Sequence, residues 1–236
     1  MRPHFSISRG LFLACAFLVT WLAVPDRGEA QQIPSPYSFI DSRHEGSFLV
    51  GIATENRGQL ELGPGGGTTL GGRYSIKMGA AFGFEATGLL LSTDRRVVDP
   101  EAEGGPEFLG TTSSLVGAVD ARIRFSPMGH RTWNGLAPYA AAGGGVGMDF
   151  RRSSALEEDM SSEARFSFGP SFMGTLGAGL RWLPGERLGF RVESNFHLWK
   201  LGTPRPFLDL QEELGSLPDQ EWTGLGTILV GASLRF

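Results

Sequence analysis

The sequence predicts an all-β fold, an eight-stranded antiparallel up-and-down transmembrane β-barrel preceded by a cleaved signal peptide. Three observations predict it. Eight segments alternate between apolar and polar residues, short and long connections alternate between these segments, and the last segment ends on an aromatic residue, Phe236. A period of two residues places apolar side chains on one face of a strand and polar side chains on the other.

The N-terminus has the pattern of a secretory signal peptide. Arg2 and Arg9 are basic, Leu11–Val24 is an apolar run, and Gly28 and Ala30 place small residues before a cleavage site. This arrangement is typical of Sec-type export.

Three parts of the chain follow from this pattern. We expect residues 1–30 to be the removed signal peptide, residues 31–45 to form a periplasmic lead-in, and residues 46–236 to form the barrel. An uncleaved anchor helix is the alternative, but the apolar run is short for one. Lipidation at Cys15, the chain's only cysteine, is disfavoured because the apolar run continues past it.

Charge and composition exclude several classes of protein. The 236 residues carry a formal net charge of -4, so the chain lacks the excess of basic residues that is typical of nucleic-acid-binding proteins. Only Lys77 and Lys200 are lysines among the 21 basic residues. Arginine is the better partner for buried, bidentate carboxylate pairing. No mature stretch of about 20 apolar residues offers a transmembrane helix.

The eight alternating segments are separated by stretches rich in Gly, Pro, Asp and Arg, as strands in hairpins are. They are Gly46–Glu55, Thr68–Lys77, Ala80–Ser92, Thr112–Phe125, Ala137–Phe150, Ala164–Leu183, Arg187–Trp199 and Leu225–Phe236.

Connections between these segments alternate in length. Those after the second, fourth and sixth segments are short, although residues 126–136 are long for such a turn. The other connections are long and rich in acids, and they cover residues 56–67, 93–111, 151–163 and 200–223. Short periplasmic turns and long extracellular loops are the pattern of outer-membrane barrels. Within the last loop, Phe207–Leu214 is compatible with a short amphipathic helix.

The two faces of the strands differ in size as well as polarity. One face is long, aromatic and nearly uncharged, which lipid tolerates; the other is charged and rich in glycine, which suits a narrow lumen. Charges enclosed there need partners, so we expect a packed electrostatic core instead of a wide pore. Its members would be Arg73, Glu85, Asp120, Arg122, Arg124, Arg181, Arg191, Glu193 and Arg235.

The segments LGTILVGASLRF, GAGLRWLPGERLGFRVESNFHLW and GLAPYAAAGGGVGMDF resemble strands of the small OmpA/OmpX-like outer-membrane β-barrel family. This resemblance implies residence in the cell outer membrane. It also implies that the terminal strand, with Phe236, Leu234 and Ala232 on one face, is the signal recognised by the barrel-assembly machinery. We expect outer-membrane lipid and lipopolysaccharide as further partners, and a monomer.

Catalysis is not expected. Some barrels of this size modify lipid A with a His, a Ser and an acid, for which His197, Ser194 and Glu193 are the candidates. Ser194 and His197 have opposite parity in the strand, which is poor geometry for a nucleophile and its base. We found no convincing metal-ligand spacing, and the glycine-rich stretches lack the features of a phosphate loop, so no metal or cofactor is expected.

The sequence therefore favours a structural or surface-interaction barrel that is not an enzyme. A narrow channel for ions or small solutes is the second hypothesis. A lipid A-modifying enzyme and a soluble lipocalin-like carrier are weaker alternatives.

Overall fold

A computed structural model describes residues 35–54, 63–102, 105–150, 154–158, 160–161, 165, 169–203, 205–209 and 220–236. The expected signal peptide, residues 1–30, lies outside the described residues. Within the described ranges, no helix has the length and apolar character needed to cross a membrane.

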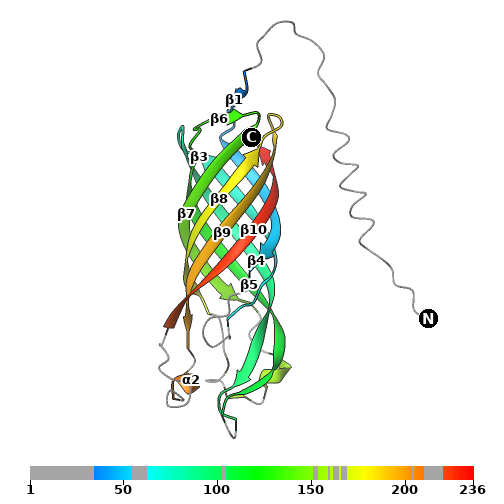
Figure 1. Cartoon of the computed structure of the whole chain (residues 1–236), viewed down its shortest axis with the longest axis vertical. Coiled ribbons are helices and arrows are strands. Elements are labelled where there is room, and N and C mark those ends of the chain that lie inside the picture. The colour runs from blue at the N-terminus through cyan, green and yellow to red at the C-terminus, as the bar shows by residue number, and fades with distance from the viewer. Residues whose placement is uncertain are drawn as a thin grey trace, which may run out of the picture. The chain divides into compact units, whose positions relative to one another are not determined.

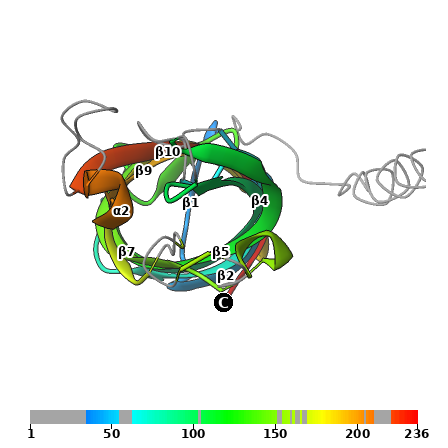
Figure 2. The same cartoon turned by 90° about the horizontal axis from the view of Figure 1, so that it is seen from below.

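Eight long strands of the described chain close into a ring (Figures 1 and 2). They are β2 (His44–Ala53), β3 (Gly67–Lys77), β4 (Phe82–Asp99), β5 (Glu107–Phe125), β7 (Leu136–Asp149), β8 (Ser171–Trp182), β9 (Leu188–Gly202) and β10 (Gln220–Arg235). Each pairs antiparallel with the next, and β10 returns to pair with β2 from Thr227↔Ala53 to Arg235↔Glu45. The predicted eight-stranded up-and-down barrel is confirmed.

The outer face of the ring is apolar and exposed. Val119, Phe172 and Leu176 are 68%, 70% and 61% exposed, whereas Glu85 and Arg122 on the inner face are 0% and 1% exposed. An apolar exterior of this extent does not suit water, and a closed barrel is the β-structure that satisfies its backbone in lipid. β2 and β3 have 10 and 11 residues, the length that a tilted strand needs to cross a bilayer. The outer face therefore contacts the membrane.

The end of the barrel with the short turns is covered by two small strands. β6 (Arg131–Trp133) lies inside the connection from β5 to β7, and β1 (Tyr37–Phe39) of the lead-in pairs with it (Figure 1). The connection at residues 126–136 is long because it contains this strand.

Aromatic side chains line the rim at the same end. His44 stacks on Tyr74 and on Phe236, with ring centroids 6.0 and 5.9 Å apart. Such rings are typical of the interfacial girdle of a membrane barrel.

Two predicted boundaries at the long-loop end were wrong, and a helix is present where one was expected. Residues 93–111 were expected to be a loop, but β4 and β5 pair as far as Asp99↔Glu107 and form most of this stretch. The sixth strand was expected from Ala164. Residues 164 and 166–168 lie outside the described residues, and β8 begins at Ser171, directly after Pro170, which lacks the N–H that a strand interior uses. The last loop holds a helix at Arg205–Asp209, α2, and residues 210–214 of the helix expected there lie outside the described residues. A 3-10 turn, η1, covers Ala155–Glu157.

Candidate functional site

The lumen collects the charged residues that the alternation predicted. All nine are buried: Arg73 on β3, Glu85 on β4, Asp120, Arg122 and Arg124 on β5, Arg181 on β8, Arg191 and Glu193 on β9, and Arg235 on β10. Each lies at an inward position of its strand, because successive side chains of a strand point to opposite faces. Eight of the nine belong to one connected cluster, and Arg235 lies apart.

Glu85 is the centre of this cluster. Its two carboxylate oxygens accept hydrogen bonds from Arg122 Nη2 and Arg124 Nη1, each at 2.9 Å. Arg191 Nη1 and Arg73 Nη1 lie 3.6 and 3.7 Å from the same carboxylate. One fully buried anion is therefore shared by four guanidinium groups from three other strands.

Glu193 forms the second anionic centre. Arg73 donates to both of its oxygens at 2.5 Å in a bidentate pair, the geometry that makes arginine–carboxylate contacts strong. The Tyr139 hydroxyl donates to Glu193 as well. Asn195 donates to Glu193 at 3.0 Å and accepts from Arg122 Nη1 at 2.7 Å. Glu193 thus ties β9 to β3 across the lumen.

Glu45 on β2 is a cluster member that sequence reasoning missed. It accepts hydrogen bonds from Arg191 and, at 3.2 Å, from Arg181. The first strand was expected to begin at Gly46, so Glu45 fell in the lead-in. The alternation could have identified it, because Glu45 lies an even number of residues before the inward-facing Leu49 and Ala53 of the same strand.

Of the expected residues, Asp120 has a weaker role in the cluster and Arg235 lies outside it. Asp120 lies 3.5 Å from Arg122 Nε without a hydrogen bond at the Asp120 Oδ1 atom. Arg235 donates to the backbone carbonyls of Gly185 and Leu188 near the short-turn end. Arg235 therefore fastens β10 to the turn before β9 instead of joining the charge cluster.

The half of the lumen toward the long loops holds two apolar clusters beside buried polar residues such as Thr69 and Thr227, an arrangement that the alternation did not predict. One cluster consists of Leu49, Leu89 and Leu229, and a second consists of Ala53, Leu91, Val116, Met173, Trp199, Phe207 and Leu225. Phe207 comes from α2 in the last loop and is 2% exposed. The last loop thus packs a side chain onto the apolar lining.

His197 lies between the charged and apolar parts. Its Nδ1 and Nε2 atoms are each 3.3 Å from a threonine hydroxyl, of Thr175 and Thr227 respectively. Ser194 is exposed on the outer face of the same strand. The structure therefore places Ser194 and His197 on opposite sides of the barrel wall. In the described residues, no group of three or more His, Cys, Asp or Glu side chains is arranged to hold a metal ion.

The closed ring, the apolar exterior and the charge cluster in the lumen define an integral membrane β-barrel of the outer-membrane type. No family model matches the sequence, and no curated relative matches it. Among solved structures, the chain is similar to Neisserial surface protein A, with 10% identity and a TM-score of 0.48 over 86% of this chain and 98% of that one.

Two other solved structures show a similar overlap. The outer membrane protein OprG from Pseudomonas aeruginosa is 13% identical with a TM-score of 0.46, over 83% of this chain and 97% of that one. The attachment invasion locus protein Ail of Yersinia pestis is 19% identical with a TM-score of 0.38, over 82% and 99% of the two chains.

Proposed function

We propose that this protein is a closed outer-membrane barrel with a structural or surface-interaction role, and that it is neither a channel nor an enzyme. The observation that carries the proposal is the buried cluster around Glu85, whose charged side chains fill the part of the lumen toward the short turns. An eight-stranded barrel has an interior that side chains can fill completely.

The apolar layer supports a closed lumen independently. An ion that enters an apolar constriction loses its hydration, and moving a charge into such a layer without a counter-charge is very costly. Trp199 and Met173 are 2% and 0% exposed in this layer, and Phe207 adds a side chain from the last loop. A permeating ion would have to cross this layer after leaving the arginine cluster.

Conductance in planar bilayers tests the closed state. We expect no stable openings from the wild-type protein. The double variant Glu85→Ala with Arg122→Ala removes a directly bonded pair and enlarges the lumen, so it should conduct more often than the wild type. Stepwise openings of the wild-type protein would contradict the proposal and favour a narrow channel.

The surface role rests on the hairpin of β4 and β5. β4 pairs with β3 only as far as Thr93, and β5 pairs with β7 only as far as Val116, whereas β4 and β5 continue together to Asp99. The hairpin thus projects past the rim of the barrel (Figure 1). On its outer face the guanidinium of Arg96 lies 4.6 Å from the ring centroid of Phe108, and Phe108 is half exposed.

Labelling of single cysteines tests the orientation on which this role depends. The chain's only cysteine is Cys15 in the expected signal peptide, so Glu101→Cys gives a mature protein with a single thiol. We expect a membrane-impermeant maleimide to label Glu101→Cys on intact cells and to leave Glu186→Cys, in a short turn at the opposite end, unlabelled. The reverse pattern would refute an extracellular hairpin.

A lack of catalysis is supported by the separation of Ser194 from His197. Mass spectrometry of lipid A from cells with and without the protein should show the same acyl pattern. A changed pattern that His197→Gln abolishes would establish the lipid-modifying enzyme instead.

The partners that fit this surface are outer-membrane lipid and lipopolysaccharide around the apolar exterior, and the barrel-assembly machinery at the terminal strand. We propose that the barrel is a monomer and binds no nucleic acid. Light scattering of the protein in detergent, corrected for the detergent mass, should give the mass of one chain.

A further inference from the structure

The charge cluster of the lumen holds more cations than anions. Among the described residues, five arginines belong to it: Arg73, Arg122, Arg124, Arg181 and Arg191. Four acids face them: Glu45, Glu85, Glu193 and Asp120. Glu85 is already within ion-pair distance of four of the arginines. A buried charge without a counter-charge is costly, so the imbalance calls for a further anion.

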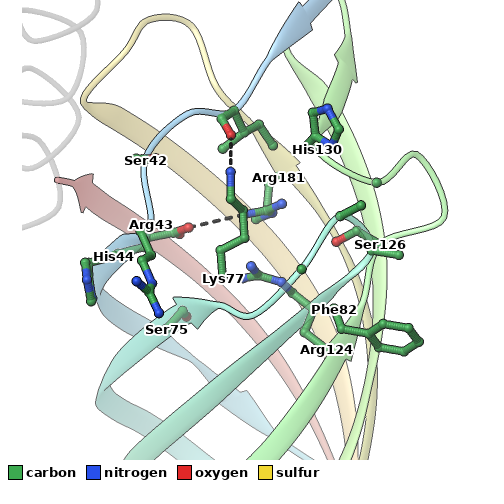
Figure 3. A pocket seen from close by; sticks show the side chains of 16 residues that line it. Ser42, Arg43, His44, Ser75, Lys77, Phe82, Arg124, Ser126, His130 and Arg181 are labelled. Carbon is green, nitrogen blue, oxygen red and sulfur yellow. Dashed lines mark hydrogen bonds and ion pairs between the residues drawn. The ribbon is translucent and has the colours of Figure 1, made fainter.

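Three basic side chains converge at the short-turn end of the lumen (Figure 3). Lys77, Arg124 and Arg181 line one small cavity there, together with Ser42, Ser126 and other residues of the lead-in and turns. In the described part of the chain, Glu45 is the only acid that lines this cavity, and Glu45 is already bonded to Arg181 and Arg191.

Several donors on the residues that line this cavity are unused. The Nε atoms of Arg124 and Arg181 are buried and have no hydrogen-bond partner among the described residues, and these side chains belong to residues that are only 6% and 3% exposed. The Lys77 ammonium has three donors and gives one to the Ile40 carbonyl at 2.7 Å. The cavity is therefore lined by positively charged residues that carry N–H groups without an acceptor.

The size of the cavity restricts its occupant. Its volume is about 20 Å³, whereas one water molecule needs roughly 10–15 Å³ by the same measure. Chloride is a single atom and suits a site of this size, whereas a tetrahedral phosphate or a sugar would require the lining residues to move apart. The geometry points to a binding site for one small monovalent anion, and we infer that chloride occupies it in the cell.

Chloride here would balance the arginines without opening the lumen. It would accept hydrogen bonds from Arg124 and Arg181 and lie beside the Lys77 ammonium, beneath the segment that leads into β2. Because the anion binds the folded barrel and not the unfolded chain, it lowers the equilibrium constant for unfolding by a factor of 1 + [Cl⁻]/Kd. At a chloride concentration ten times the Kd, the barrel would be about 11-fold less unfolded.

Urea unfolding of the protein in zwitterionic detergent tests this site, with sodium chloride compared with sodium gluconate at equal ionic strength. We expect a saturable stabilisation by chloride and by bromide. Lys77→Met should weaken the apparent chloride affinity at least ten-fold. Arg235→Gln is the matched control, because Arg235 is a buried arginine at the same end that does not line this cavity, and this variant should keep the wild-type chloride dependence.

A crystal grown with bromide gives a readout that does not depend on stability. An anomalous peak between Lys77, Arg124 and Arg181 is expected, and it should be absent from Lys77→Met crystals. Equal urea midpoints in chloride and gluconate, an unchanged chloride effect in Lys77→Met, or a bromide structure without the peak would each overturn the inference.

Discussion

Replacement of Glu85 by glutamine is the sharpest test of how this barrel is held together. The substitution keeps the shape of the side chain and removes its negative charge. Arg122 and Arg124 each lose a charge-assisted hydrogen bond of 2.9 Å, and Arg73 and Arg191 lose an ion-pair partner within 3.7 Å.

The expected cost is large, because the carboxylate is fully buried. Hydrogen bonds to charged groups contribute about 1.5–3 kcal/mol each, and breaking a buried ion pair on one side costs about 3–5 kcal/mol. These contributions overlap, so we expect Glu85→Gln to lower the free energy of unfolding by about 3–5 kcal/mol. At a urea dependence of about 2 kcal/mol per molar, the midpoint would fall by about 2 M.

Urea titration of the folded barrel, followed by tryptophan fluorescence and by heat-modifiable gel migration, measures this change. Glu186→Gln is the control, since Glu186 is exposed in a turn and its loss should change stability by less than about 0.5 kcal/mol. Arg124→Met in the Glu85→Gln background removes one unmatched cation and should recover about 1 kcal/mol or more. A Glu85→Gln barrel within about 1 kcal/mol of the wild type would refute the central role of this carboxylate.

Three further outcomes are expected. Gly143→Ala should destabilise the barrel by about 1–3 kcal/mol in the same urea assay, because the new Cβ would lie 2.0 Å from a backbone oxygen of β5. Gly88→Ala is the control and should fold normally, because a Cβ there meets nothing within 4 Å. Phe236→Ala should reduce the amount of folded barrel in the outer membrane of cells while refolding in detergent is little changed. Arg95→Met breaks the buried 2.7 Å ion pair with Glu157 and should speed cleavage of the loop containing η1 by added protease. Equal cleavage rates in the variant and the wild type would show that this ion pair does not hold the loop on the barrel.

Within the membrane, the sequence was sufficient to predict the strands and which face of each strand points outward. Lipid demands an apolar outward residue at every second position, and a narrow lumen demands small or paired residues between them. β9 shows both demands, with Val192, Phe196 and Leu198 outside and Arg191 and Glu193 inside. Outside the bilayer neither demand applies. The Asp94–Asp99 stretch therefore looked like a loop, although it continues the ladder of β4.

The contents of the lumen were only partly predictable. Alternation identifies which charges point inward, but the pairing of Glu193 with Arg73 joins strands that are far apart in sequence, which no local pattern reveals. The apolar layer did have a signal. Leu89–Leu91 and Ile228–Val230 are runs of three apolar residues, and such runs place apolar side chains on both faces at that height. The pairing of β1 with β6 covers three residues per strand and is too short for any such pattern.

The cross-lumen pairs bear on closure as well as stability. Glu193 joins β9 to β3, and Glu45 joins β2 to β8 and β9, so the pairs connect strands that share no ladder. A slip of one residue in β9 would turn Arg191 and Glu193 toward lipid, where an arginine at the bilayer midplane costs about 2–4 kcal/mol, and would leave Arg73 without its bidentate partner. The apolar layer opposes such a slip less, because leucine is tolerated on either face. The charge cluster therefore specifies the register in which the barrel closes, and the apolar clusters close the lumen toward the long loops.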